Sequence, residues 1–93
     1  MTLFQRVLNH LNKTSTIFSA DEEKRQIYIH RVYNSVILTF YKGGNLRKLE
    51  VRTSDHLFVE QTYGERERWA LYEREEGKLV LFGTTGKIDI YFS

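Results

Sequence analysis

Hydrophobic and polar positions alternate with a period of two along most of this chain, and only its N-terminal segment follows a helical period. The longest apolar run is residues 36–41, Val-Ile-Leu-Thr-Phe-Tyr, in which only Thr39 is polar. Such β-branched and aromatic residues favour strands, and the following Lys-Gly-Gly-Asn sequence is typical of a turn. We therefore predict a central strand that is buried on both faces and flanked by the rest of the chain.

The N-terminal segment has the spacing of an amphipathic helix from about residue 2 to residue 12. Its apolar positions fall on one helical face: Leu3, Phe4, Val7, Leu8 and Leu11. Thr2 is a suitable N-cap, and we expect this helix to cover the sheet. A membrane-anchoring helix is the alternative, but the opposite face has few basic residues, which argues against it.

Residues 16–33 allow several interpretations. Residues 16–18 fit a short strand or a loop, and Ser19-Ala20-Asp21-Glu22 matches a capping box, which predicts a helical turn that reaches Arg25. A helix that continues to Tyr33 is the competing interpretation. Ile27 and Ile29 would lie on one side of a strand but on opposite sides of a helix, so we favour a strand over residues 27–33.

The remaining chain predicts short strands joined by short turns. Leu49 and Val51 alternate with Lys48, Glu50 and Arg52, and further strand patterns cover residues 57–63, 68–74, 78–82 and 87–92. Parallel pairing needs long crossovers, for which the chain has no room. We therefore predict an α+β fold, in a single domain over residues 1–93, with the helix packed on a curved antiparallel meander of about six to seven strands or on a small barrel.

The alternation also predicts which residues of the C-terminal strands face the core. The inward set is Trp69, Leu71, Leu79, Leu81, Ile88, Ile90 and Phe92. The reverse side is apolar as well, with Tyr72, Val80, Phe82 and Tyr91. Either the sheet curls into a barrel, or a second apolar face is left for a partner.

Composition narrows the classes of protein to consider. The 93 residues include no cysteine, which excludes disulfides and thiolate metal sites, and the net charge is only +2. The N-terminus lacks the pattern of a signal peptide, and no apolar run is long enough to cross a membrane. We therefore expect a cytoplasmic protein with no membrane partner.

Catalytic and cofactor motifs are missing from the sequence. His10, His30 and His56 fall in different predicted elements, without the short spacing of a helical metal motif. Residues 83–87 differ from a phosphate-binding loop in spacing and are interpreted as a hairpin turn. We expect no catalytic residues, no metal and no cofactor, and hence no enzyme; a pocket that joins His30 or His56 to carboxylates would favour one.

A basic and aromatic set of residues lies on or beside the central strands. It comprises Arg25, Tyr28, Arg31, Tyr33, Tyr41, Lys42, Arg47, Lys48 and Arg52. Aromatic and basic side chains on a sheet can stack bases and follow phosphates.

Residues 65–68 form a second pattern, of alternating charge. In a strand this pattern would place the negative side chains on one face and the positive side chains on the other.

These observations lead to two functional hypotheses. The leading one is a small non-enzymatic module that binds another protein, or a second copy of itself, through a sheet face or edge. Its small size and missing catalytic motifs suggest an accessory or inhibitor protein of a phage or other mobile element. The alternative is a single-stranded nucleic-acid-binding protein that uses the basic and aromatic set.

Overall fold

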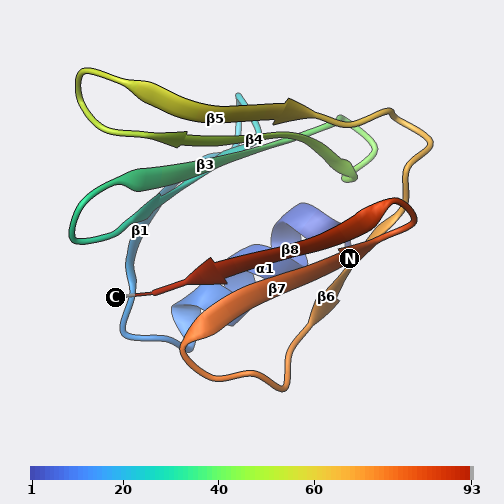
Figure 1. Cartoon of the computed structure of the whole chain (residues 1–93). Helices are drawn as coiled ribbons and strands as arrows, with labels where there is room; N and C mark the ends of the chain where they lie inside the picture. Colours follow the sequence, from blue (N-terminus) through green and yellow to red (C-terminus); the bar gives the residue numbers. More distant parts are fainter. Residues whose placement is uncertain (93) are drawn as a thin grey trace.

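The computed structural model describes residues 1–92, which form one helix and eight strands in two antiparallel sheets (Figure 1). Helix α1 (Leu3–Asn12) comes first in the chain. The strands follow as β1 (Ile17–Asp21), β2 (Gln26–His30), β3 (Ser35–Phe40), β4 (Leu46–Arg52), β5 (Leu57–Thr62), β6 (Trp69–Tyr72), β7 (Lys78–Gly83) and β8 (Gly86–Tyr91). The predicted α+β class, with its N-terminal helix and antiparallel strands, is confirmed.

The larger sheet has the order β1-β2-β3-β4-β5, so β3 is its central strand. All residues of β3 from Val36 to Phe40 are buried, which confirms the strand that was predicted to be buried on both faces. Val36, Leu38 and Phe40 belong to the core between the two sheets. Ile37 and Thr39 lie on the outer face, where the side chains of neighbouring strands cover them.

The smaller sheet has the order β6-β7-β8 and packs below the larger one in Figure 1, with α1 behind it. Its inward residues match the prediction: Trp69, Leu79, Leu81, Ile88 and Ile90 are in the core, and Leu71 and Phe92 pack against it. The reverse side carries the expected Tyr72, Val80, Phe82 and Tyr91, together with the charged Lys78, Lys87 and Asp89. Val80 on that side is only 1% exposed.

Helix α1 begins at a capping box, in which the Thr2 hydroxyl accepts from the Gln5 amide at 3.2 Å and the Gln5 side chain accepts from the Thr2 amide at 3.0 Å. These bonds satisfy two donors that a helix start leaves free. Phe4, Val7 and Leu11 are buried, and the Phe4 ring meets Phe40 edge to face with centroids 5.3 Å apart. The helix therefore covers the sheet as predicted.

The structure corrects the prediction for residues 16–25. Ser19 lies inside β1 and is not an N-cap, and residues 22–25 form a hairpin turn in place of a helical turn. The Asp21 carboxylate accepts from the Lys24 amide at 3.0 Å, and Arg25 closes the turn with φ 52°. The physical reason is pairing: β1 hydrogen-bonds to β2 in a register that turns Phe18 and Ile29 towards the core. The strand count is therefore eight, above the predicted number.

The sheets do not close into a barrel in residues 1–92. Strand β5 pairs only with β4, and β8 pairs only with β7, so each sheet ends in an open edge. Figure 1 shows these two edge strands on the same side of the molecule, β5 above and β8 below.

In the part of the chain that is described, no helix has the length and apolar character needed to cross a bilayer.

Candidate functional site

Strand β5 is the most exposed strand of the molecule. All six of its residues are exposed, and three consecutive apolar side chains, Leu57, Phe58 and Val59, are 43%, 60% and 38% exposed. Edge strands usually carry lysine, proline or inward charges that discourage pairing with another chain. β5 contains no lysine or proline. Its protective features are Glu60 and a bulge opposite Val51 and Arg52. Its free backbone edge is therefore open to a further strand.

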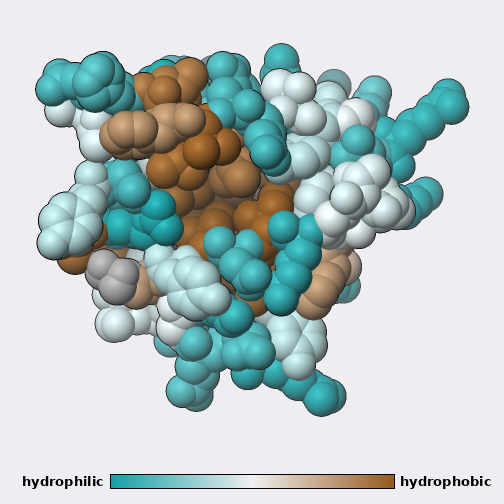
Figure 2. All heavy atoms as spheres, in the orientation of Figure 1, coloured by the Kyte–Doolittle hydropathy of each residue, from teal (hydrophilic) through white to brown (hydrophobic). Residues whose placement is uncertain are grey.

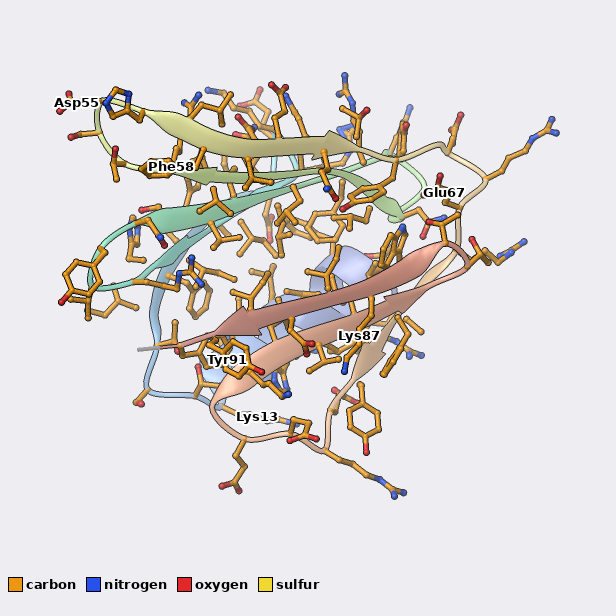
Figure 3. The ribbon with its side chains drawn as sticks, in the orientation of Figure 1. Lys13, Asp55, Phe58, Glu67, Lys87 and Tyr91 are labelled. Atoms are coloured by element: carbon orange, nitrogen blue, oxygen red, sulfur yellow. The ribbon has the colours of Figure 1, made fainter. Side chains whose placement is uncertain are left out.

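An apolar hollow lies directly beside this edge, and we call it the front hollow. The inward side chains of the three strands that border it are apolar: Leu49, Val51, Val59, Ile88 and Ile90. Figure 2 shows it as a brown depression between β4 and β5 above and β8 below. Figure 3 places Phe58 at its rim beside β5, while Lys87 and Tyr91 lie on the other side of β8. Apolar surface and an unpaired strand edge thus occur together.

Four members of the predicted basic and aromatic set come together at one end of the larger sheet. Tyr28, Arg31, Tyr33 and Arg52 line a hollow of about 560 Å³ between the β2–β3 and β4–β5 turns, which we call the turn hollow. The Arg31 Nε donates to Asn34 Oδ1 at 2.7 Å, and partial burial lowers the pKa of Arg31 from its usual value. The guanidinium is therefore held in place before any ligand arrives.

Three other members lie at the opposite end of the sheet. Arg25, Tyr41 and Lys42 line a smaller hollow of about 220 Å³ next to the start of α1. The Tyr41 hydroxyl donates to the Tyr63 carbonyl at 2.6 Å, so it joins the ends of two strands. The Arg25 carbonyl accepts from the Phe40 amide at 2.9 Å. These contacts give two of the three residues a structural role.

Of the remaining two members, Arg47 and Lys48, only Lys48 is ion-paired, and it shares Glu50 with Arg52. Lys48 lies 3.8 Å from Glu50 and 3.7 Å from Glu60, and Arg52 lies 3.7 Å from Glu50 on its other side. Arg47 is exposed at a bulge, where its carbonyl accepts from the Tyr63 amide at 2.8 Å. The predicted set is therefore divided between two ends of the sheet, with ion-paired side chains in the middle.

The outer face of the smaller sheet is a charged and aromatic surface that was not predicted from the sequence. The rings of Tyr72 and Phe82 meet edge to face at 5.8 Å, and the Lys87 ammonium lies 5.5 Å from the Phe82 ring. Lys78 lies 5.1 Å from the Tyr91 ring, and Asp89 pairs with Lys78 at 3.6 Å and Lys87 at 3.4 Å. The alternation of β7 and β8 contained this signal, because aromatic and charged residues share the reverse side.

Residues 65–68 do not form a strand, which corrects the expectation that their charges separate onto two faces. They lie in the turn that connects the two sheets. Asn45 holds this turn through its side-chain amide, which donates to the Glu67 carbonyl at 2.6 Å.

Residues 83–86 form the β7–β8 hairpin turn, as predicted.

The three histidines have unrelated surroundings. His10 is buried with Nε2 3.4 Å from the Lys78 carbonyl, His30 lies 3.4 Å from the Ser35 hydroxyl, and His56 lies against Phe58. The hollow that His30 lines includes no carboxylate. Within residues 1–92, no three His, Asp or Glu side chains are grouped in a way that could hold a metal ion.

Comparisons of the chain with protein-family models, with curated proteins and with solved structures found no match.

Proposed function

We propose that this chain is a protein-binding module that captures an extended segment of another protein along β5. The observation that carries the proposal is the strand itself, an unpaired edge whose consecutive apolar residues Leu57, Phe58 and Val59 are exposed beside the front hollow. An added strand would gain backbone hydrogen bonds from β5, and alternate side chains would enter the hollow. Burial of apolar surface would supply most of the affinity.

The sequence of β5 favours a foreign segment over a second copy of the chain. If β5 paired over its full length with a second β5, in antiparallel orientation, Leu57 would face Thr62, Phe58 would face Gln61 and Val59 would face Glu60. Each apolar residue would then lie opposite a polar one, which stabilises a sheet poorly. The partner expected here is apolar opposite residues 57–59 and polar opposite residues 60–62.

Charge further defines this partner. Glu60 is the cross-strand neighbour of Glu50, so two carboxylates stand side by side with Lys48 near both. A basic residue opposite Glu60 would relieve this repulsion, whereas another acidic residue would increase it. The segment is therefore expected to be basic at the end that lies near Glu60.

A displayed library of random peptides, selected on the purified protein, tests the proposal. We expect enriched peptides with alternating apolar residues followed by a basic one, and we expect the Phe58→Lys variant to weaken their binding about ten-fold or more. Tyr91→Lys is the matched control, because Tyr91 is 59% exposed and Phe58 60%. The control should leave binding unchanged.

Two outcomes would overturn the proposal. One is a selection without enriched peptides, or with peptides that bind Phe58→Lys as tightly as the wild-type chain. The other is a sedimentation measurement in which the wild-type chain is a dimer and Phe58→Lys is a monomer, because the occupant of the edge would then be a second copy.

A further inference from the structure

The turn hollow lies on the outer face of the larger sheet, away from the front hollow. Figure 1 shows the β2–β3 and β4–β5 turns at the same end of that sheet, on the left of the view. Between them lies the space of about 560 Å³, a size within the usual range of small-molecule sites. Its lining comes from β2, β3, β4 and the two turns.

The floor of the turn hollow is rigid. Ile37 is 7% exposed and has Tyr28 and Glu50 as its cross-strand neighbours. The Tyr28 hydroxyl donates to Gln26 Oε1 at 2.6 Å, which fixes the position of its ring on the sheet face. A flat ring held in this way is ready to stack on a planar ligand with little loss of conformational entropy.

Positive charge stands on two sides of this floor. Arg52 is the cross-strand neighbour of Ser35, next to the β2–β3 turn; one of its terminal nitrogens lies 3.7 Å from Glu50, and the other N–H groups are left for an anion. Arg31 is fixed within that turn by its bond to Asn34 and by a contact of 3.4 Å from Nη1 to the Tyr91 carbonyl. Among the described residues Arg31 has no ion-pair partner, and no carboxylate lines the turn hollow. The guanidinium keeps further N–H donors that an anion could accept.

The tip of the β2–β3 turn adds a second aromatic ring. Tyr33 is 88% exposed although it lines the turn hollow. Packing therefore does not explain its position, and its ring is accessible to a ligand in the hollow. Hydroxyls of Ser35, Thr53 and Ser54 complete the lining with neutral hydrogen-bonding groups.

We propose that the turn hollow binds a nucleotide unit, with its base stacked on the tyrosine rings and its phosphate held by Arg31 and Arg52. Aromatic side chains stack on any base, and guanidinium groups match the geometry of phosphate oxygens. The nucleotide unit comes either from a free nucleotide or from a single-stranded nucleic acid. This site is separate from β5 and does not depend on the protein-binding proposal.

Fluorescence anisotropy with a labelled oligonucleotide of about ten thymidines or uridines at low salt is the first test. We expect binding that weakens as salt is raised, and on the order of ten-fold weaker binding for Tyr33→Ala and for Arg52→Gln. The matched controls are Tyr91→Ala and Arg47→Gln, an exposed tyrosine and an exposed arginine outside the turn hollow. They should bind as the wild-type chain does, and so should Phe58→Lys.

Competition identifies the source of the nucleotide. Adenosine and uridine monophosphates that displace the oligonucleotide at similar concentrations indicate a free nucleotide, whereas displacement only by unlabelled oligonucleotide indicates a single strand. The proposal is overturned if inorganic phosphate alone competes equally well, since the bases would then contribute nothing. It is also overturned if neither type of probe binds, or if the two pairs of variants behave alike.

Discussion

At the scale of single residues, Trp69 joins the two sheets. Its ring lies across Gly83 of the neighbouring strand and meets the Tyr63 ring at 4.9 Å, and its backbone amide donates to Asn45 Oδ1 at 3.4 Å. The indole Nε1 is buried without a hydrogen-bond partner in the described residues. Packing therefore holds Trp69 in the core, and its neighbours leave little space for a larger side chain.

The close approach of Trp69 to Gly83 makes that glycine sensitive to substitution. A Cβ atom at residue 83 would stand 2.7 Å from three carbons of the Trp69 ring. We expect Gly83→Ala to lower the free energy of unfolding by about 1–3 kcal/mol, because the ring has to move out of a packed position. Urea denaturation measures this change.

Gly86 is the matched control for that measurement. It lies at the other end of the same hairpin turn, and a Cβ there would meet no atom within 4 Å. Gly86→Ala should leave stability unchanged or raise it slightly, since alanine restricts the unfolded chain. Equal losses for the two variants would contradict the role given to the Trp69 ring.

Tyr63 gives the protein a pH dependence in alkaline solution. Burial, with a smaller contribution from the charge of Glu67, raises the pKa of Tyr63 above its ordinary value of 10.0. The folded chain therefore disfavours the ionised phenolate of Tyr63 and favours its neutral form. The resulting contribution to the free energy of unfolding is complete below the pKa that Tyr63 has in the unfolded chain. It is lost as the pH rises through the higher pKa of the folded chain.

The Tyr63→Phe variant tests this, because phenylalanine does not ionise. We expect the Tm of the wild-type chain to fall more than that of Tyr63→Phe between about pH 8 and about pH 11. Parallel curves for the two proteins over that range would show that Tyr63 ionises equally well in the folded chain.

At the scale of elements, β3 and α1 hold the fold while the exposed edges and turns are left for binding. Ile37 is buried and Tyr41 is fixed by its hydroxyl, so the central strand is a structural element. Helix α1 fills the opposite side of the core, where Val7 and Leu11 are 0% exposed. Both candidate sites consequently lie at the margins of the larger sheet, one along β5 and the other between the β2–β3 and β4–β5 turns.

The apolar face of α1 should show graded sensitivity to truncation. Leu11 is completely buried, whereas Leu8 is only partly buried at the margin of the same core. We expect Leu11→Ala to lower the free energy of unfolding by about 2–5 kcal/mol through lost burial and a cavity, and Leu8→Ala to lower it by clearly less. Thermal unfolding followed by circular dichroism compares them, and an equal loss would contradict this packing.

At the scale of the whole molecule, two sheets meet on one side and stay apart on the other. Residues 63–68 lead from β5 to β6, and Asn45 holds this crossing through bonds to Glu67 and Trp69. On the open side, β5 and β8 have no second neighbour. Figure 2 shows an apolar depression in the surface between them.

This arrangement predicts a gradient of hydrogen exchange across the larger sheet. Amides of β3 should exchange slowest, because β3 is buried and paired on both sides, and amides of β5 should exchange fastest among the paired strands. Exchange measured by NMR on the isolated chain checks this order. Protection of β5 equal to that of β3 would mean that something already covers the edge in solution.

The sequence predicted most of the fold from local pattern. The helical spacing of Val7 and Leu11 and the alternation of Leu79 and Leu81 identified core positions correctly, because one face of each element must be apolar to be buried. The pattern of residues 16–18 fits both a strand and a loop, and residues 19–25 were assigned to a helical turn because Ser19 and Glu22 fit a capping box. Only the hydrogen bonds to β2 decide for a strand.

For the candidate sites the sequence supplied residue types but no positions. The alternation placed Lys48, Glu50 and Arg52 on one strand face, yet nothing in it indicates that Lys48 also pairs with Glu60 or that Arg31 and Arg52 border one hollow. Those contacts depend on register and on turn geometry, which join residues distant in sequence. For the same reason Phe58 was assigned to a strand without any sign that this strand is an edge.

The sequence alone therefore determined the helix, the central strand, the antiparallel pairing of short strands and the apolar faces, because each follows from a local period of hydrophobicity and from short connections. Tertiary structure decided that eight strands divide into two sheets, that β5 and β8 each keep one unpaired edge, and that Arg31 and Arg52 border one hollow. These features arise from where the chain crosses between sheets and which side chains then meet. Local pattern contains no information about either.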